Sequence, residues 1–317
     1  MRTPSHWQNK NWLSSLLYPF SCCYALATLL RLKLHKPCKV AVPVICIGNL
    51  TAGGVGKTPV AASIAQILKT NGYNPFFISR GYGGTLDHAI VDVNIHSASE
   101  VGDEPLLLAR IAPVVINPRR DIAAKEAIEN GADIIVMDDG FQNPYLYKNK
   151  SLLVIDGATG LGNQMPIPSG PLREFIHQGL KRANGIIILG EDKHQCANLA
   201  PNLPLFRGKI APKCPKEHTD NIIAFAGIGR PEKFYQSLRD CGFNILKTYD
   251  FPDHHFYTNE ELNEIITQAE NLGTQIYTTG KDIVKIPHKL LQYFNVLDIE
   301  IEWDNQELLE RFITFRR

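Results

Sequence analysis

The stretch GNLTAGGVGKTP, residues 48–59, decides the fold of this chain. It follows an apolar run at 40–49 that is typical of a strand, and it leads into a helix-like segment at 59–70. Glycines between a strand and a helix let backbone N–H groups close around phosphate oxygens, and the start of the helix adds a partial positive charge. We therefore predict a nucleotide-binding loop formed by Thr51, Ala52, Gly53, Gly54, Val55, Gly56, Lys57 and Thr58.

Two polar side chains close this loop. Lys57 can reach the β- and γ-phosphates of a nucleotide, and the hydroxyl of Thr58 can bind Mg²⁺. One position departs from the Walker A pattern, because Thr51 stands where that pattern has glycine, five residues before Gly56. A purely structural glycine turn does not explain a Lys–Thr pair at the start of a helix. A nucleotide and Mg²⁺ are therefore the expected ligands of this loop.

Outward from the loop, short apolar runs alternate with helical segments. Strands are expected at 74–84 (a strand with a glycine turn), 112–118, 132–140, 151–157 and 184–190, and helices at 103–110 and 120–130. Continuous apolar strands that alternate with helices are buried on both faces of a parallel sheet. We expect an α/β fold with a P-loop NTPase-like, mainly parallel sheet flanked by helices.

Charge is distributed unevenly along the 317 residues. Residues 1–86 carry nine Lys or Arg and no acidic residue, which gives this segment a charge of +9, whereas the rest of the chain carries −8. The net charge of +1 gives no reason to expect a nucleic-acid partner. A basic N-terminal segment suits an anionic lipid surface or a polyphosphate, although solvated lysines without a partner give the same pattern.

The N-terminal segment contains an uncharged run, NWLSSLLYPFSCCYALATLL, at 11–30. As a helix this run spans about 30 Å, the thickness of a bilayer core. Basic residues flank it on both sides, and no signal-peptide cleavage site precedes them. The first interpretation is a helix that lies in the membrane interface; a single spanning anchor and a buried core helix are the alternatives. All three leave the rest of the chain in the cytosol.

Composition divides the chain into three segments. The polar, proline-rich stretch at 211–220 is typical of a linker, and the elements expected after it, at 221–229, up to about 240, at 277–282 and at 295–303, suggest a second unit. The sequence predicts a membrane-associated helical segment, a P-loop domain and a smaller C-terminal α/β domain, at 1–39, 40–210 and 211–317 respectively.

The chain has seven cysteines, an odd number, with no CxxC pair and no zinc-ligand spacing. Free thiols in a reducing compartment are the simplest interpretation.

Acidic side chains follow two of the predicted turns. IIVMDDG at 134–140 is an apolar strand that ends in Asp138 and Asp139, the usual Walker B form for holding Mg²⁺. Adjacent carboxylates repel each other, so a cation is their natural partner. GDEP at 102–105 places Asp103 and Glu104 at a helix start, where N-capping by Asp103 is the alternative interpretation.

Further polar residues lie where an α/β sheet binds ligands, at the carboxyl ends of strands. DHH at 253–255 offers a titratable base, His254, beside an acid, although most such histidines are surface residues. Arg80, Arg120 and Arg173 follow strands or lie in the loop at 162–174, and arginine suits bidentate contacts with phosphate.

Taken in order, GNLTAGGVGKTP, SRGYGG, VGDEP, DDGFQ, GPLRE, FPDHH and TTGKD resemble the motifs of the tetraacyldisaccharide 4′-kinase family. The resemblance extends from the N-terminal apolar run to about residue 285. It implies a membrane-associated P-loop kinase that moves the γ-phosphate of ATP to the 4′-hydroxyl of a tetraacylated glucosamine disaccharide 1-phosphate, a lipid A precursor. The implied product is lipid IVA, and the implied location is the cytoplasmic face of the bacterial inner membrane. No protein partner is implied.

The same resemblance implies roles for single residues. Lys57 and Thr58 would bind phosphate and Mg²⁺, Asp103 would take the proton of the acceptor hydroxyl, and His254 would be its partner. Glu104, Asp138 and Asp139 would position Mg²⁺ or the transition state, and Arg80, Arg120 and Arg173 would contact phosphates. One position departs: the family motif TTEKD reads TTGKD here, with Gly280 in place of glutamate.

The competing class is a membrane-bound P-loop ATPase switch. Such proteins carry a lysine at the position that Ala52 occupies here, and they do not need a DHH element. A guanine-nucleotide switch is disfavoured because the base-reading N/TKxD motif is missing. A metabolite kinase without a lipid substrate would leave residues 11–30 unexplained.

Overall fold

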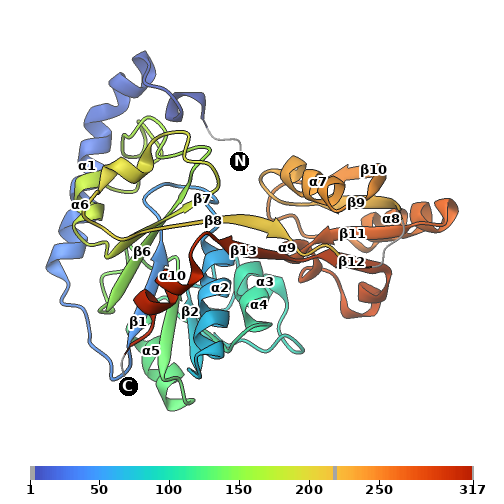
Figure 1. Cartoon of the computed structure of the whole chain (residues 1–317), viewed down its shortest axis with the longest axis horizontal. Helices are drawn as coiled ribbons and strands as arrows, with labels where there is room; N and C mark the ends of the chain where they lie inside the picture. Colours follow the sequence, from blue (N-terminus) through green and yellow to red (C-terminus); the bar gives the residue numbers. More distant parts are fainter. Residues whose placement is uncertain (1–3, 217–219, 316–317) are drawn as a thin grey trace.

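The computed structural model describes residues 4–216 and 220–315. Residues 1–3, 217–219 and 316–317 lie outside the described part, so the outer ends of the predicted 1–39 and 211–317 segments and part of the predicted linker do as well. The described chain forms a larger unit that contains the P-loop and a smaller unit beside it (Figure 1).

The larger unit is built on a nine-stranded sheet. Its strands, in spatial order, are β13 (Ile299–Trp303), β8 (Leu205–Pro212), β7 (Gly185–Leu189), β6 (Lys150–Asp156), β1 (Val44–Gly48), β5 (Ile134–Asp138), β2 (Pro75–Ser79), β4 (Val114–Ile116) and β3 (Ala89–Ile90). All neighbours pair parallel except at the two edges, where β13 and β3 run antiparallel. The prediction of a mainly parallel sheet is therefore confirmed.

Alternate side chains of each central strand enter two different cores. Ile45 and Ile47 of β1 face one core, and Val44 and Cys46 face the other. The first core is covered by α2 (Lys57–Thr70), α4 (Asp103–Ala109) and α10 (Gln306–Ile313), and the second by α5 (Arg120–Glu129) and α6 (Ile176–Leu180). Burial on both faces explains why these strands are continuously apolar in sequence.

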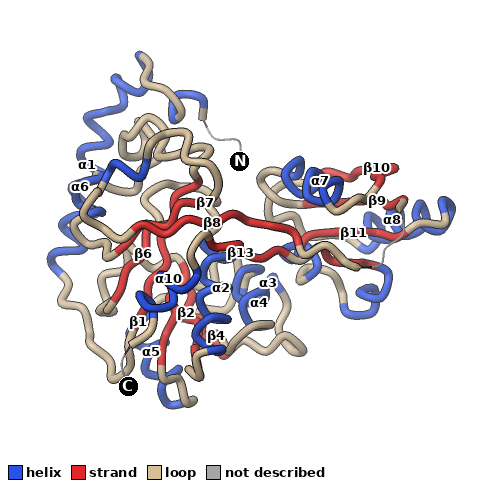
Figure 2. Tube along the Cα trace, viewed as in Figure 1, coloured by secondary structure: helices blue, strands red, loops and turns tan. Residues whose placement is uncertain are grey.

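The smaller unit has a four-stranded parallel sheet. Its strands, in spatial order, are β10 (Asn244–Asp250), β9 (Asn221–Ala226), β11 (Gln275–Thr279) and β12 (Phe294–Leu297). Two long helices cover it, α7 (Pro231–Asp240) and α8 (Asn259–Leu272) (Figure 2). The shorter helices of the described chain are η1 (Ser5–Trp7), α3 (Ala98–Val101), η2 (Cys196–Leu199), α9 (Gly280–Ile283) and η3 (His288–Tyr293).

The segment predicted as one C-terminal domain is divided between the two sheets. β12 belongs to the smaller sheet, but β13 returns to the larger one and pairs antiparallel with β8. The helix after β13, α10, packs on α2, and Trp303 donates a hydrogen bond from Nε1 to Ser63 Oγ at 2.9 Å. The prediction that 295–303 lies wholly in the second unit is wrong, and the linker predicted from 211 begins inside β8. β8 and β13 form a ribbon that joins the two units (Figure 1).

A long apolar helix, α1 (Trp12–Leu34), lies along the outside of the larger unit (Figure 1). Asn11 caps it: the side chain accepts a hydrogen bond from Ser14 N–H, and Ser14 Oγ accepts one from Asn11 N–H. By length and composition α1 can cross a membrane, a property that it shares with core helices of soluble proteins. Only 17% of its most apolar window is buried, which does not fit the core-helix alternative.

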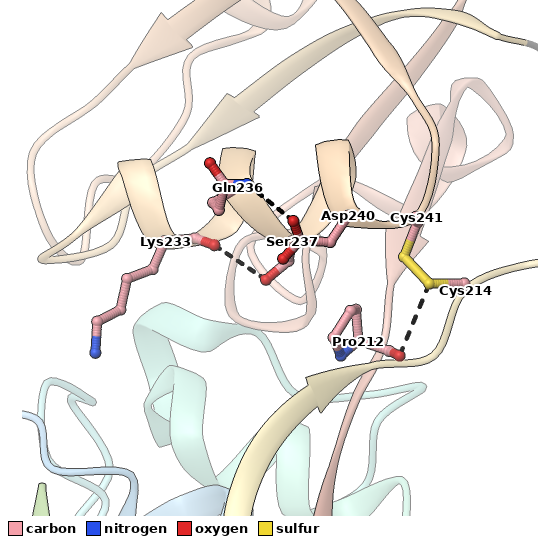
Figure 3. Close-up of a disulfide and its surroundings, with 7 residues drawn as sticks. All are labelled: Pro212, Cys214, Lys233, Gln236, Ser237, Asp240 and Cys241. Carbon is pink, nitrogen blue, oxygen red and sulfur yellow. Dashed lines mark hydrogen bonds between the residues drawn. A yellow bond between two sulfur atoms is a disulfide. The ribbon is translucent and has the colours of Figure 1, made fainter. Parts of the chain in front are cut away.

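Two of the cysteines form a disulfide, Cys214–Cys241, with a sequence separation of 27 (Figure 3). It ties the stretch that follows β8 to the end of α7. The prediction that all seven cysteines are free thiols is therefore wrong for this pair. The spacing gave no indication, because the two positions meet only when α7 packs beside the end of β8. The other five are free.

Candidate functional site

The loop between β1 and α2 has the backbone shape that its glycines predict. Gly56 adopts φ +88° as the residue before α2, and a Cβ there would lie 2.6 Å from Leu189 Cδ1. Asn49 holds the loop closed, since its Nδ2 donates to the carbonyl of Thr51 at 2.7 Å. This arrangement leaves the start of α2 open to a phosphate group.

Lys57 and Arg173 both approach the carboxylate of Asp139. Lys57 Nζ lies 3.7 Å from Asp139 Oδ2, and Arg173 Nη1 donates to Oδ1 at 3.0 Å. Burial lowers the pKa of Lys57. Burial alone would raise the pKa of Asp139, but Lys57 and Arg173 outweigh it and hold that pKa below its ordinary value. In the absence of phosphate, Asp139 therefore keeps the two cations at the mouth of the loop.

The surroundings of Asp138 fit a bound cation. It ends β5, it is buried, and its Oδ2 accepts a hydrogen bond from Thr58 Oγ1 at 3.3 Å. Its Oδ1 is buried and has no hydrogen-bond partner among the described residues. Burial raises its pKa to about 6. An orphaned buried carboxylate oxygen beside a P-loop hydroxyl fits Mg²⁺, which prefers hard oxygen ligands.

Asp103 and His254 meet across the two units. Asp103 begins α4, and His254 lies in the loop after β10 with φ +61°. Nδ1 of His254 lies 2.9 Å from Asp103 Oδ2. The hydrogen bond with Asp103 raises the pKa of His254. Burial opposes ionisation of Asp103, but hydrogen bonds with the side chains of His254 and Glu104, together with the charge of Lys281, hold its pKa well below the ordinary value.

Glu104 contacts a residue to which the sequence analysis gave no role. Its carboxylate forms an ion pair with Lys281, the first cation after Gly280 in the TTGKD stretch. Burial and the neighbouring Asp103 raise the pKa of Glu104, and the two acids outweigh burial to raise that of Lys281. Donor atoms of Asp103, Glu104 and His254 lie within 4.8 Å of one another. The sequence analysis quoted Lys281 only as part of the TTGKD motif and gave it no role, although its place in that motif was an available signal.

The two groups of residues are adjacent. Glu104 is close enough to Lys57 to raise the pKa of that lysine by charge, and Asp138 interacts in the same way with Lys281. The structure therefore brings Lys57, Thr58, Asp103, Glu104, Asp138, Asp139, Arg173 and His254 to one edge of the sheet.

The remaining two arginines differ in their surroundings. Arg120 is buried at the start of α5, and its Nε has no hydrogen-bond partner among the described residues. Burial lowers its pKa to about 10, although the charges of Asp138 and Asp139 oppose this. Arg80 follows β2 and is exposed. Arg120 is therefore ready to accept an anion beside the acidic pair.

Gly280 begins α9, the helix that packs on α4. A Cβ at this position would lie 3.3 Å from Leu107 Cδ1, a close contact. In this chain, the absence of a side chain at Gly280 lets α9 lie close to α4, and Lys281 then pairs with Glu104.

The loop at 162–173 connects the N-terminal helices with the P-loop. Ser21 Oγ in α1 donates to Ser169 Oγ at 2.8 Å, and Asn163 Nδ2 donates to the carbonyl of His6 at 2.7 Å. At the other end of the loop, the carbonyl of Pro171 accepts a hydrogen bond from Ala52 N–H at 2.7 Å. Arg173, at the end of the same loop, is the residue that contacts Asp139.

Comparison with known proteins agrees with this geometry. A family model described as tetraacyldisaccharide-1-P 4′-kinase matches residues 13–316. A relative from Paramagnetospirillum magneticum, named tetraacyldisaccharide 4′-kinase, is 42% identical over 98% of this chain and 97% of its own length. One of the same name from Parvibaculum lavamentivorans is 44% identical over 91% of this chain and 87% of its own length.

A solved structure supports the same conclusion. LpxK from Aquifex aeolicus, described as an "apo" form in complex with ATP, superposes with a TM-score of 0.78 at 27% identity. The match covers 95% of this chain and 98% of that one. The chain described here therefore belongs to the tetraacyldisaccharide 4′-kinase family.

Proposed function

We propose that this kinase transfers the γ-phosphate of ATP to the 4′-hydroxyl of a tetraacyldisaccharide 1-phosphate and so produces lipid IVA. The observation that carries the proposal is the Asp103–His254 contact at 2.9 Å beside a P-loop, because it places an acid–base pair for a hydroxyl acceptor next to a phosphate site. Family membership supports the identity of donor and acceptor. Phosphoryl transfer requires alignment and charge neutralisation more than covalent chemistry from the protein.

The donor side of the site consists of the P-loop and the acidic strand end. Lys57 neutralises the β- and γ-phosphates, and backbone N–H groups of the glycine-rich part of the loop, from Gly53 to Thr58, surround them. Thr58, Asp138, Asp139 and Glu104 are the residues that would hold Mg²⁺, which when bound neutralises charge on the phosphate oxygens. Arg173 is paired with Asp139 and can move to the transferred phosphate once Asp139 has another partner.

The acceptor side consists of Asp103 and His254. Asp103 takes the proton from the acceptor hydroxyl as the oxygen attacks phosphorus. A neutral His254, in the tautomer that carries its proton on Nε2, then receives that proton at Nδ1, and the resulting imidazolium donates to Asp103, the hydrogen bond that raises the pKa of His254. Arg80 and Arg120 lie on the same side of the sheet as Asp138 and would bind phosphate groups of the substrate.

We further propose that α1 holds the protein on the cytoplasmic face of the inner membrane. Its exposed apolar side chains suit the interface of a bilayer with anionic lipids, as do the basic residues in its last turn, Arg31 and Lys33, and just after it, Lys36 and Lys39. In this position the acyl chains of the substrate stay in the membrane while its sugar hydroxyl reaches the site.

The test uses purified, detergent-solubilised protein with labelled ATP, Mg²⁺ and the tetraacyl disaccharide 1-phosphate. We expect labelled lipid from the intact protein and none from the Lys57→Ala variant. No labelled lipid, together with ATP hydrolysis that empty membranes stimulate, would overturn the proposal in favour of an ATPase switch.

A further inference from the structure

A buried carboxylate lies behind the proposed proton-transfer pair. Asp282 in α9 is fully buried, at 0% exposure. Its Oδ1 accepts a hydrogen bond from Tyr257 Oη at 2.8 Å and lies 2.7 Å from Lys285 Nζ. Its Oδ2 accepts from Gly227 N–H at 3.1 Å and from Thr279 Oγ1 at 2.6 Å. One side chain thus joins the end of β9, the chain after the DHH loop, the end of β11 and α9.

Two of these partners enclose the loop that carries His254. The N–H of His254 donates to the carbonyl of Gly227 at 3.3 Å, so the residue that Asp282 holds by its N–H holds His254 by its carbonyl. Tyr257 follows the loop three residues later. A Cβ at position 227 would lie 2.8 Å from Tyr257 Oη and 3.1 Å from Asp282 Oδ1, so only glycine leaves room for this contact.

Helix α9 also contacts the chain beside Asp103, the other member of the proton-transfer pair. Lys281 precedes Asp282 and forms its ion pair with Glu104, the residue next to Asp103. Asp282 therefore lies between the loop of His254 and the cation that neutralises the acids on α4. Charge-assisted hydrogen bonds within a buried network are stronger than neutral ones and hold their members in one arrangement.

We propose that Asp282 is a positioning residue that sets the place of His254 against Asp103, acting through Gly227 and Tyr257. This inference rests on the proposed function, because the pair that it positions is the one assigned to proton transfer. Asp282 is not one of the residues proposed to contact nucleotide or acceptor. Its loss should therefore lower kcat and leave the affinity for ATP unchanged.

The first experiment compares Tyr257→Phe with the unchanged kinase. This substitution removes one hydrogen bond to Asp282 and leaves its ion pair with Lys285 intact. We expect kcat to fall about fivefold, since one hydrogen bond contributes on the order of 1 kcal/mol, with KM for ATP unchanged. Asp282→Asn should lower kcat further, and Tyr257→Phe remains informative if that variant fails to fold.

The matched control is Tyr249→Phe. The hydroxyl of Tyr249 is also buried in the smaller unit, but it has no hydrogen-bond partner among the described residues. Its removal should leave kcat unchanged. An equal loss of kcat in both variants would mean a general structural effect and would overturn the inference.

A double-mutant cycle tests the route through His254. If Tyr257 and Asp282 act by positioning His254, Tyr257→Phe should have no further effect on kcat when His254→Ala is already present. An undiminished fivefold loss in that background would contradict the inference while leaving the proposed function intact.

A second measurement does not depend on turnover. In protein labelled with ¹⁵N-histidine and held at a pH at which His254 is an imidazolium, its Nδ1–H proton, assigned by its loss in His254→Gln, should exchange slowly with water. We expect faster exchange in Tyr257→Phe and no change in Tyr249→Phe. Unchanged exchange in Tyr257→Phe overturns the inference. Faster exchange together with full activity of His254→Ala instead supports the positioning and rejects the proposed proton transfer.

Discussion

Asp103 and Glu104 are neighbours in sequence, yet their surroundings shift their pKa values in opposite directions. For Asp103, hydrogen bonds with the side chains of His254 and Glu104 and the charge of Lys281 outweigh burial and lower the pKa. For Glu104, burial and the charge of Asp103 raise the pKa in spite of Lys281. Two carboxyl groups whose pKa values are driven apart are suited to different tasks. Asp103 is suited to accept a hydrogen bond or proton, and Glu104 is suited to pair with a cation.

Replacement of Asp103 should separate chemistry from binding. We expect Asp103→Ala to lower kcat by about 10²- to 10⁴-fold, the usual contribution of general base catalysis, because the acceptor hydroxyl loses its proton acceptor. The affinity for ATP should change little, since Asp103 lies on the acceptor side. Steady-state kinetics with a separate ATP-binding titration checks this. Equal losses in kcat and ATP affinity would contradict the assignment.

The pH dependence should report His254. The hydrogen bond with Asp103 raises its pKa above the ordinary value near 6.5. The contribution of the pair to stability is therefore complete below pH 6.5 and is lost as pH rises through the raised pKa. Activity should change in the opposite direction, because only neutral His254 accepts the proton. We expect kcat to rise with pH, with an inflection at a pKa above 6.5. This rise should be absent in His254→Gln and retained in His88→Gln.

Metal-free protein should show the cost of ionising Asp138. Its pKa is raised to about 6, so the folded protein binds an extra proton between about 3.8 and 6 and loses stability as pH rises through that range. At pH 7.5 without Mg²⁺, Asp138→Asn should therefore raise the free energy of unfolding, by about 1–3 kcal/mol. Mg²⁺ should raise Tm of the unchanged protein at pH 7.5 more than at pH 5. Calorimetry with and without MgCl₂ checks both, and a destabilised Asp138→Asn would contradict them.

At the scale of elements, the sequence predicted the features that depend on residues close together in the chain. The strand–loop–helix at β1 and α2 follows from its glycines, and the buried strands of the larger sheet follow from their apolar runs. The antiparallel pair β8–β13 could not be predicted from such local patterns. Its two strands are far apart in sequence, and β13 begins at Ile299, only one residue after the end of β12. The sequence analysis did not predict α8, although Thr258 and Glu261 form a capping box, a pattern that marks the start of a helix in sequence.

The exposed face of α1 should govern attachment to lipid. Trp12, Leu16 and Phe20 lie one helical turn apart and are 76%, 62% and 66% exposed. We expect Leu16→Ser and Phe20→Ser each to weaken binding to vesicles about tenfold or more, since burial of such a side chain contributes about 1.5–3 kcal/mol. Vesicle flotation checks this. Ile95→Ser is the matched control, because Ile95 is 75% exposed but lies outside α1; the same loss in that variant would contradict the assignment.

At the scale of the molecule, the proposed site depends on a contact that no local pattern contains. Asp103 and His254 are 151 positions apart and belong to different units. Each motif alone had an ordinary explanation, helix capping for one and a surface histidine for the other. Their pairing was expected only from the family resemblance, and Lys281 entered the site only when the two units were seen together.

The disulfide should stabilise the smaller unit. In the chain-entropy account, closing a loop with a sequence separation of 27 contributes about 3–4 kcal/mol. We expect Cys214→Ser to lower the free energy of unfolding by about that amount in non-reducing buffer and to have no effect under reduction. Cys38→Ser, at a free cysteine, is the control. If denatured, unreduced protein took up seven alkyl groups where five are expected, the bridge would be absent.

The loop at 162–173 gives the molecule one further property. It is hydrogen-bonded to α1 through Ser21 and to the P-loop through Pro171, and Arg173 at its end contacts Asp139. If attachment of α1 to a membrane shifts this shared segment, lipid attachment and nucleotide binding are thermodynamically linked, and such linkage is reciprocal. If a bilayer strengthens the affinity for ATP by some factor, ATP must strengthen the hold of the protein on the bilayer by the same factor, so a loaded kinase would remain at the surface that supplies its acceptor.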